Sequence, residues 1–531
     1  MKLTRRQFVG TTMAGAMAAP FVSRVRTASA STSVLRVIPH ADLQNIDPIW
    51  TTAYISRNHG YMVFDTLFAM DESLTPQPQM VDTYERSSDG LTWTFVLRDG
   101  LEFHDGAAVT ADDCVASLTR WGVRDGMGQK LFQQVESLEA ADDKTIVMNL
   151  ATPYGLVLES IGKISSNVPF MMPKRLAETD PFEQIPDVIG SGPYRFVTDE
   201  WQPGALTVYE KFEGYVPRSE PANSASGGKV VNVDRCEWIY TPDATTAMNA
   251  LISGEVDYYE QVPGDLAPII AQSEGVNVEV LDNLGNQGML RFNHLLPPFD
   301  NPMVRRAVLQ AMDKTKYMQA AVGNPDFFND QCDSYFPCGS PLETDAGLDM
   351  ITPPDIERAR ATLEEAGYDG TPVVIMQSTD IPILSAMALV TAETLRDIGM
   401  EVDVQAMDWS TLTSRRALQE PVSDGGWNIF HTWWIGGDIV NPISAVGLSG
   451  GGSEAAWFGW PEDAQIEELR DAFANEPDPA AQQELGRQIQ QRAIEIGTHG
   501  NTGTFFVPVG YRDNVAGLIK SPVQFFWNIS V

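Results

Sequence analysis

The sequence predicts an α/β protein that divides into two or three lobes. Its 531 residues, 43% of them hydrophobic, are too many to surround a single core. Strand and helix patterns alternate along the chain, and residues 373–406 have a strand–helix–strand pattern, which is typical of two parallel strands joined by a crossover helix. We therefore expect mixed sheets with helices packed against them.

The most strongly patterned segment lies between residues 82 and 113. Residues 91–97 alternate polar and apolar side chains, as in a half-buried strand, and residues 101–103 predict a second strand. Thr110 is placed to cap a following helix whose first turn carries acids. Three turn dipeptides separate these elements, and in each of them Gly tolerates positive φ: Asp89-Gly90, Asp99-Gly100 and Asp105-Gly106.

The other expected elements follow from the same signals. Strands are predicted at residues 34–38, 146–150, 237–240, 373–376 and 401–406. Helices are predicted at residues 242–251, 302–313, 356–367, 383–398 and 480–496. The segment at 219–228 is rich in Ser, Asn, Gly and Pro, and it predicts a surface loop.

The first thirty residues predict export. Arg5-Arg6 stands in a twin-arginine pattern, an apolar run covers residues 9–22, and residues 28–30 have the A-x-A form of a cleavage site. A run of roughly fourteen residues is too short to cross a hydrocarbon layer of about 30 Å. No Cys follows it for lipid attachment, so we expect a mature protein that is free in a bacterial periplasm.

The charge of the chain excludes several classes of partner. The formal charge is −35, and because residues 1–30 carry five cations and no acid, their removal leaves −40. Such a chain repels phosphate backbones and anionic lipids, so we expect no nucleic-acid partner. The sequence has no H-E-x-x-H, Walker or dinucleotide-binding motif, and its six His are scattered, none of them paired by spacing with a nearby Cys or Ser. We therefore expect neither an enzyme nor a cofactor.

The four cysteines point to one local disulfide. Five residues separate Cys332 from Cys338, which is enough to close a loop in an oxidising compartment. Cys114 and Cys236 are interpreted as separate buried thiols. No His or Cys lies at metal-ligand spacing to either pair, so no metal site is expected.

Several segments resemble the extracytoplasmic solute-binding proteins, family 5, of the peptide/nickel ABC-importer class. The strongest is residues 87–113, which match the family pattern S-x-D-G-x-x-Y-T-F-x-L-R-x-G-x-x-F-H-D-G-x-x-V-T-A-x-D, with Trp93 for its usual Tyr. Residues 189–196, 297–313 and 356–368 resemble further family elements in the same order.

The resemblance implies a two-lobed periplasmic-binding-protein fold of type II, cluster C, hinged and with an extra subdomain in the first lobe. We expect lobe I at residues 31–285 plus 503–531 and lobe II at residues 286–502. The implied function is that of a monomeric receptor that captures a peptide or small amino-acid-like solute and delivers it to an inner-membrane ABC permease. Two alternatives are a receptor for a small cationic or zwitterionic metabolite and a scaffold or chaperone on the same fold.

The resemblance also suggests ligand-binding residues. Asp438 stands four residues before Pro442, where peptide-binding members hold an Asp that captures the ligand's ammonium; the alternative is an Asp that caps a turn. Trp433 and Trp434 precede it, at one residue more than the family's spacing, and strand alternation predicts that only one of them faces the cleft.

Three further candidates come from the same comparison. Arg416 follows Trp409 by seven residues, the spacing of a family Arg that approaches the ligand; the alternative is a solvated arginine on a helix face. Trp409 is included with it as a candidate. Tyr54 follows the Asp47-Pro48 turn in the region where the first lobe contributes to the cleft.

Overall fold

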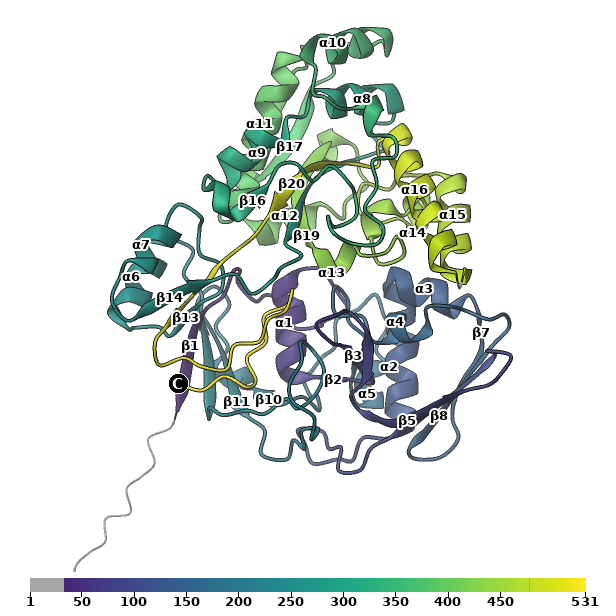
Figure 1. Cartoon of the computed structure of the whole chain (residues 1–531), viewed down its shortest axis with the longest axis vertical. Coiled ribbons are helices and arrows are strands. Elements are labelled where there is room, and N and C mark those ends of the chain that lie inside the picture. Colours follow the sequence, from purple (N-terminus) through teal and green to yellow (C-terminus); the bar gives the residue numbers. More distant parts are fainter. Residues whose placement is uncertain (1–32, 477) are drawn as a thin grey trace, which may run out of the picture. The chain divides into compact units, whose positions relative to one another are not determined.

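Two mixed β-sheets organise this computed structural model, which describes residues 33–476 and 478–531 (Figure 1). The predicted twin-arginine segment lies outside the described residues. Within the described part, the two largest sheets have seven and six strands, and each combines parallel and antiparallel pairs. The α/β fold with mixed sheets is thereby confirmed.

The first main sheet contains strands from both ends of the described chain. At its centre β1 runs parallel to β12, with Val37 opposite Trp238, and β21 runs antiparallel to its neighbours. In spatial order its strands are β10 (Tyr194–Phe196), β11 (Leu206–Lys211), β12 (Arg235–Ile239), β1 (Val34–Ile38), β13 (Tyr258–Tyr259), β21 (Val509–Arg512) and β14 (Val276–Glu279).

The second main sheet has β15 and β19 at its centre, paired antiparallel. The predicted strand–helix–strand unit forms its edge, where β17 and β18 are parallel and joined by helix α11 (Pro382–Asp397). In spatial order its strands are β16 (Phe328–Asn329), β20 (His499–Phe505), β15 (Asn286–Phe292), β19 (Ile429–Ile435), β17 (Val373–Ser378) and β18 (Val402–Met407).

A third, antiparallel sheet carries the most patterned segment of the sequence. Its order is β5 (Val81–Arg86), β6 (Thr92–Leu97), β8 (Thr145–Leu150) and β7 (Val135–Ala140). Helix α2 (Ala111–Arg124) packs against it and begins with the predicted cap, because the Thr110 side chain accepts from the Asp113 backbone N–H and the Asp113 carboxylate binds back to Thr110. Two short pairs complete the strands: β2 (Asp65–Thr66) with β9 (Phe170–Met171), and β3 (Phe68–Met70) with β4 (Pro76–Pro78).

Besides α2 and α11, which are described above, the helices divide into those before and those after the start of the second main sheet in the chain. Those that precede the second main sheet in the chain are α1 (Tyr54–Val63), α3 (Gly126–Phe132), α4 (Val157–Ile161), α5 (Lys174–Ala177), α6 (Ala244–Ser253) and α7 (Ala267–Ala271). The others are α8 (Pro302–Ala311), α9 (Lys314–Ala321), α10 (Ile356–Glu365), α12 (Trp409–Arg415), α13 (Gly436–Ile439), α14 (Gly452–Ala455), α15 (Ala464–Asn475) and α16 (Pro479–Ile496).

The chain passes between the two main sheets twice. It leaves the first sheet after β14 and enters the second at β15, and it returns between β20 and β21. We call the part that holds the first main sheet and the antiparallel sheet the first lobe, and the part that holds the second main sheet the second lobe. The boundaries at 285/286 and 502/503 stay predictions; β20 itself continues to Phe505.

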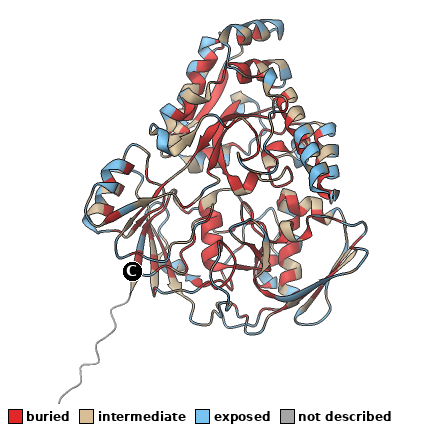
Figure 2. Ribbon diagram, in the orientation of Figure 1, coloured by how far each residue is buried: buried red, intermediate tan, exposed pale blue. Residues whose placement is uncertain are grey.

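Buried side chains run through both lobes, and Figure 2 shows them along the central strands, with exposed residues on the outer helices. One buried cluster joins Phe95 of the antiparallel sheet to Ile375 of the second main sheet. A second cluster, which includes Tyr209 and Trp238, packs against the first main sheet. The lobes therefore share packed surface.

Two local predictions are wrong. Residues 101–103 form no strand, and only an isolated bridge between Glu102 and Ala108 remains, because the flanking turns leave too few residues for a ladder. The loop at 219–228 is not wholly on the surface, since residues 224–228 are buried. Ser224 contacts Ser521 through their hydroxyls at 3.0 Å, and the adjacent Lys229 pairs with Asp65 at 2.8 Å.

Candidate functional site

A small cavity between the lobes gathers most of the predicted site residues. It has a volume of about 30 Å³, and we call it the aromatic cavity. Tyr54 reaches it from the start of α1, and Trp409, Arg416, Trp433 and Trp434 reach it from the second lobe. Its remaining lining residues are His40, Thr52, Ala53, Ile381 and Thr432.

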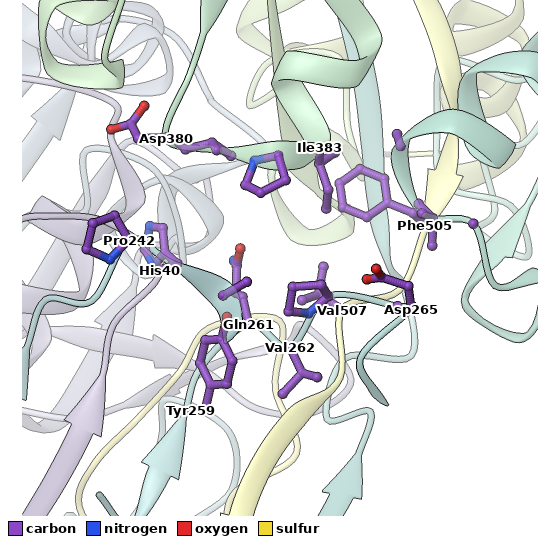
Figure 3. Close-up of a pocket in the computed structure, with 18 of the residues that line it drawn as sticks. His40, Pro242, Tyr259, Gln261, Val262, Asp265, Asp380, Ile383, Phe505 and Val507 are labelled. Atoms are coloured by element: carbon purple, nitrogen blue, oxygen red, sulfur yellow. The ribbon is translucent and has the colours of Figure 1, made fainter. Parts of the chain in front are cut away.

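Three larger cavities adjoin it, and one of them, of about 350 Å³, shares only Thr52 with it. The other two share more of its wall. The large cavity, of about 380 Å³, shares His40 and Ile381 with the aromatic cavity and also borders Phe505 and Val507, beside one of the chain crossings (Figure 3). The acidic cavity, of about 200 Å³, shares Ala53 and Trp409 with the aromatic cavity, and its wall includes Asp42, Asp380 and Asp408. The large and acidic cavities also share Tyr240 and Asp380, so the three cavities adjoin one another between the lobes.

Arg416 is a buried cation in the wall of the aromatic cavity. Arg416 is only 2% exposed, so the alternative of a solvated arginine on a helix face is wrong. The guanidinium lies 4.7 Å from the ring centre of Phe458 and 5.6 Å from those of Trp409 and Trp457. Burial lowers the pKa of Arg416 to about 9, so the group remains cationic at neutral pH.

The partners of Arg416 do not neutralise it. Nη2 donates to the Thr52 hydroxyl across the lobe boundary at 3.2 Å, and Nε has no hydrogen-bond partner among the described residues. No carboxylate of the described chain lies within ion-pair distance. A buried cation without an anion is costly, and aromatic faces compensate only in part. The arrangement is suited to receive a carboxylate.

Local structure explains where Arg416 lies. Asp408 caps α12 by accepting from the backbone N–H of Thr411, which fixes Trp409 as the first helical residue. Arg416 ends this helix, and its backbone carbonyl accepts from the Trp427 indole at 3.2 Å. Both ends of the short helix are therefore held in place, which directs the Arg416 side chain toward the lobe boundary.

Tyr54 connects the two lobes through Asp438. Its hydroxyl donates to the Asp438 carboxylate at 2.7 Å and accepts from the Ile435 backbone N–H at 2.8 Å. Asp438 lies on α13, which stands above α1 in Figure 1, and is 2% exposed. Ser165 also donates to it, at 3.3 Å. Burial raises the pKa of Asp438, whereas the Tyr54 hydrogen bond and the charges of nearby cations lower it.

Asp438 itself lies outside the three cavities. Two cations already act on its charge, Arg57 and Lys163, and the Arg57 guanidinium lies 4.2 Å from the centre of the Tyr54 ring. Direct contact between Asp438 and a ligand stays a prediction. Its observed contacts hold the Tyr54 hydroxyl in place.

Both tryptophans contribute to the aromatic cavity, contrary to the expectation of one. They lie on β19, whose seven residues are all buried because strands flank it on both sides and the sheet is covered on both faces. The Trp434 indole donates to the Met289 sulfur at 3.4 Å, while Trp433 meets Phe505 edge to face. Each ring therefore packs in the hydrophobic core and also lines the aromatic cavity.

The sequence interpretation missed several lining residues. His40 lies two residues after the end of β1, and its ring contacts the Glu260 carboxylate at 2.9 Å. Asp380 precedes α11, and Tyr240 follows β12; both border the large and the acidic cavities. The only available signal was position, since all three lie at the ends of strands or helices, where ligand-binding residues of α/β sheets gather.

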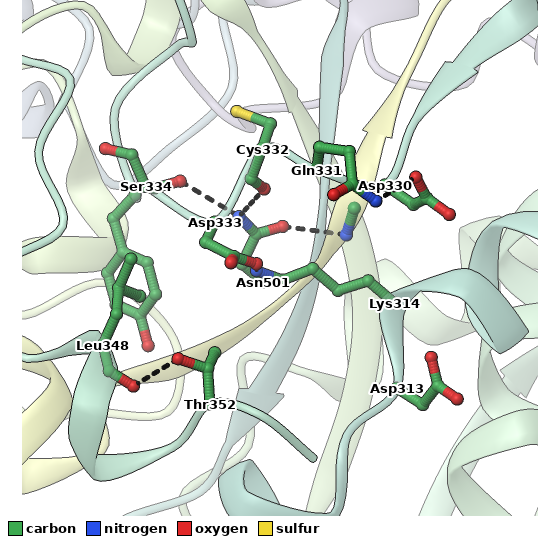
Figure 4. Close-up of polar contacts among 12 residues, drawn as sticks. Asp313, Lys314, Asp330, Gln331, Cys332, Asp333, Ser334, Leu348, Thr352 and Asn501 are labelled. Atoms are coloured by element: carbon green, nitrogen blue, oxygen red, sulfur yellow. Dashed lines mark hydrogen bonds and ion pairs between the residues drawn. The ribbon is translucent and has the colours of Figure 1, made fainter.

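The cysteines lie away from these cavities. Cys332 and Cys338 form a disulfide with a Cα–Cα distance of 5.9 Å, and Cys114 and Cys236 are buried free thiols. Asn501 of β20 donates to the carbonyls of Cys332 and Ser334, and Lys314 pairs with Asp333 (Figure 4). The disulfide loop is therefore anchored to the second main sheet.

Two kinds of feature are absent from the described residues. No group of three or more His, Cys, Asp or Glu is placed to hold a metal ion. Among the same residues, each helix is too short or too polar to span a bilayer.

Comparison with known proteins gives concordant results. The model of the bacterial extracellular solute-binding proteins, family 5 Middle, matches residues 75–456. A probable peptide ABC transporter periplasmic-binding protein, y4tO of Sinorhizobium fredii, is 36% identical, covering 100% of this chain and 99% of the relative.

Solved structures resemble this fold over 94% of the chain and 98% of theirs. The periplasmic binding protein AgaA from A. tumefacien R10, in complex with agropinic acid, has a TM-score of 0.79 at 21% identity. The DppA protein of Helicobacter pylori, in complex with the peptide STSA, has a TM-score of 0.78 at 19% identity.

Proposed function

This chain belongs to family 5 of the bacterial extracellular solute-binding proteins, and we propose that it captures a short peptide or an amino-acid derivative between its lobes and delivers it unchanged to an ABC permease. The observation that carries the proposal is the Arg416 guanidinium, which is buried at the lobe boundary and has no anionic partner among the residues that the structure describes. A ligand carboxylate would supply the missing charge through a planar, two-point contact.

The surroundings of Arg416 support a ligand rather than a structural role. Among the described residues, the only hydrogen bond of its guanidinium reaches Thr52 of the other lobe, so a group bound there would touch both lobes. The adjoining cavities of about 380 and 200 Å³ provide room for the rest of the ligand. The volume of the aromatic cavity, about 30 Å³, is too small for more than one functional group, so entry requires the lobes to separate.

The relatives' names favour peptides, because y4tO is described as a probable peptide transporter component and the H. pylori protein was solved with a peptide. The complex of AgaA with agropinic acid favours the second candidate, a small amino-acid-like metabolite. Both candidates carry a carboxylate. A scaffold or chaperone role on the same fold predicts no response to either.

A binding screen tests this function. Purified wild-type protein is mixed with dipeptides, tripeptides and amino-acid derivatives, and thermal shift and calorimetry are recorded. At least one carboxylate compound should raise the Tm by mass action. Arg416→Gln should weaken its binding by 100-fold or more.

The matched control is Arg415→Gln. Arg415 precedes Arg416, but its guanidinium bonds Gly425, Gly426 and Gln405 and borders none of the three cavities, so its replacement should change affinity less than twofold. Equal effects of the two variants, or a wild type that responds to no compound, would contradict the proposal.

Export and oligomeric state complete the proposal. Residues 1–30 are proposed to direct twin-arginine export, and the mature receptor is proposed to act as a monomer in the periplasm. Replacing Arg5 and Arg6 together by Lys should retain the chain in the cytoplasm, as measured by cell fractionation. Normal periplasmic recovery of that double variant would contradict this assignment.

A further inference from the structure

The large cavity lies at the ends of three neighbouring strands of the first main sheet. β12 and β13 both pair parallel with β1, and residues that follow these strands line the cavity: His40 after β1, Tyr240 after β12 and Gln261 after β13. From the second lobe, Ile381 and Ile383 border it at the start of α11. Ligands of α/β sheets bind beyond the carboxyl ends of parallel strands, so this cavity is well placed to hold part of a ligand.

His40 presents an unpartnered nitrogen to this cavity. Its side chain is only 6% exposed, and the ring lines both the large and the aromatic cavities. Ring Nδ1 lies 2.9 Å from Oε2 of Glu260. An ionised carboxylate can only accept, so Nδ1 carries the proton, and Nε2 of the neutral ring is an acceptor. Nε2 has no hydrogen-bond partner among the residues that the structure describes.

Glu260 fixes the orientation of this ring. It follows β13 directly, is 3% exposed, and its backbone N–H donates to the Ile38 carbonyl of β1 at 3.0 Å. Its Oε2 also accepts from the His40 backbone N–H at 2.8 Å, and its Oε1 accepts from Asn58 at 2.8 Å. Burial raises the pKa of Glu260, but the contacts with His40 and the charge of Arg57 outweigh burial and lower this pKa. The carboxylate is therefore ionised and holds His40 by two bonds.

Helix α11 begins on the opposite wall with a free donor. Its N-cap, Ile381, provides no side-chain cap, and Pro382 has no N–H. Within the described chain, the Ile383 backbone N–H has no hydrogen-bond partner. Such first-turn N–H groups carry the partial positive charge of a helix N-terminus, here that of a helix of 16 residues. A group bound between the walls thus meets an acceptor at His40 and a donor at Ile383.

Gln261 adds a group of both kinds. Figure 3 shows His40 and Gln261 extending from the first lobe, with Ile383 across the cavity from them. No described residue hydrogen-bonds to the Gln261 side chain, which is partly buried. Its amide offers both N–H donors and a carbonyl acceptor. The groups that the wall leaves for a ligand at this point are therefore neutral.

The charges of the wall disfavour an ionic ligand group. No Lys or Arg is among the described residues that line the large cavity, whereas Asp265 and Asp380 are, so an anion is repelled. A cation gains little, because Asp265 is exposed to solvent and Oδ1 of Asp380 already accepts from Ser378 and from the Trp409 backbone N–H. A neutral group that both donates and accepts fits this wall best, and a carboxamide is such a group.

We propose that the large cavity is a subsite for a neutral carboxamide side chain of the ligand, whose N–H donates to His40 Nε2 and whose carbonyl accepts from the Ile383 backbone N–H. The amide of Gln261 is a further partner of the same group. This subsite rests on the proposed function and specifies its substrate class: a Gln-like or Asn-like side chain on a ligand whose carboxylate lies at Arg416. An apolar analogue leaves these donors and acceptors unpaired, so the subsite discriminates against it.

The experiment compares four side chains of similar length. Free Gln, Glu, Met and Lys, and dipeptides that place each of them before or after Ala, are titrated by calorimetry into wild-type protein and three variants. His40→Asn keeps an N–H for Glu260 but has no atom at the place of Nε2, and Gln261→Leu removes the amide at similar size. Gln272→Leu is the control, because Gln272 is exposed at the end of α7 and outside the large cavity. The Tm of each variant separates loss of binding from loss of folding.

The expected pattern is a preference for the neutral amide. In at least one position, wild-type protein should bind the Gln compound tenfold or more tightly than its Met, Glu and Lys counterparts. His40→Asn should reduce the preference for Gln over Met to less than threefold while changing the affinity for Met less than threefold. Gln261→Leu should reduce this preference by threefold or more, and Gln272→Leu should change it less than twofold. Should His40→Asn fail to fold, Gln261→Leu decides.

Three results would overturn the carboxamide subsite while leaving the proposed function intact. The first is a wild type whose preference for Gln over Met is below tenfold in every position. The second is tighter binding of the Lys or Glu compound than of the Gln compound. The third is a folded His40→Asn variant that keeps more than a threefold preference for Gln. A wild type that binds no compound of the screen, or binding that Arg416→Gln leaves unaffected, would instead contradict the proposed function.

Discussion

Arg291 and Arg416 are both buried arginines of the second lobe, and their surroundings differ. Burial lowers the pKa of each to about 9, and each guanidinium lies beside the ring of Trp457. The nitrogens of Arg291 donate to four backbone carbonyls, those of Phe458, Gly447, Thr498 and Trp457. Arg416 donates to one hydroxyl. A buried cation whose donor nitrogens are all hydrogen-bonded to the protein, such as Arg291, stabilises the loops that it contacts. A buried cation with unused donors, such as Arg416, is suited to bind a ligand.

The largest expected effect is that of replacing Arg291, whose guanidinium nitrogens are all hydrogen-bonded. Arg291→Met would leave four buried carbonyls without this donor, and each unsatisfied group costs about 1–3 kcal/mol. We expect the free energy of unfolding to fall by about 3 kcal/mol or more, as measured by urea denaturation followed by circular dichroism. An unfolding midpoint equal to that of the wild type would show that the hydrogen bonds from Arg291 to these carbonyls do not stabilise the fold.

A pH experiment extends the comparison to two carboxylates. Asp438 has a raised pKa, so its ionisation costs stability as pH rises above its unfolded pKa of about 3.9. Glu467 has a pKa lowered to about 2, despite partial burial, because it pairs with Arg470 and Lys130; it contributes stability above its unfolded pKa and loses it as pH falls.

The two neutral variants should therefore respond oppositely. Relative to wild type, Asp438→Asn should gain in urea midpoint as pH rises from about 4 to 7, and Glu467→Gln should recover toward wild type as pH falls from about 5 to 3. Parallel pH profiles for the two variants would contradict the assigned directions.

A smaller effect is expected when the unsatisfied arginine is removed. Arg416→Met deletes a buried charge without stranding an anion, and apolar replacement of buried charges is often neutral or stabilising. The unfolding free energy should stay within about 1 kcal/mol of wild type or rise, measured by the same urea titration. A loss as large as that of Arg291→Met would assign Arg416 a structural role.

The smallest expected effect concerns the hydrogen bond between the Arg416 guanidinium and Thr52. Thr52→Val removes the hydroxyl acceptor while preserving the side-chain shape, and a net hydrogen bond is worth about 1 kcal/mol. Affinity for the ligand identified in the screen should fall about fivefold, by calorimetry at constant pH. A hundredfold loss would mean that Thr52 itself binds the ligand.

Much of the fold could be predicted from local pattern. The β17–α11–β18 unit follows from hydrophobic period, and the α2 cap follows from Thr110 and Asp113, because both signals act within a few residues. The pairing of β21 with β13 joins residues some 250 apart, and no local signal encodes it. Family resemblance, rather than spacing, indicated that Tyr54 and Arg416 border one cavity.

The failed predictions have a common physical cause. The burial of Arg416 and of residues 224–228 depends on partners that are distant in sequence, such as Thr52 and Ser521. Alternation could not separate Trp433 from Trp434, because a central strand covered on both faces buries every residue. A local sequence pattern predicts the conformation that a segment prefers by itself. The burial of these residues depends instead on tertiary contacts with distant parts of the chain.

Because β19 is buried on both faces, it also limits how ligand preference can change in evolution. Any replacement of Trp433 or Trp434 disturbs the packing of the sheet interior together with the cavity wall. Thr52, His40 and Ile381 line the same cavity but lie outside the regular strands and helices. Replacing them should therefore disturb the fold less than replacing either tryptophan. Paralogues that transport different nutrients should therefore diverge at these three positions before they diverge at the tryptophans.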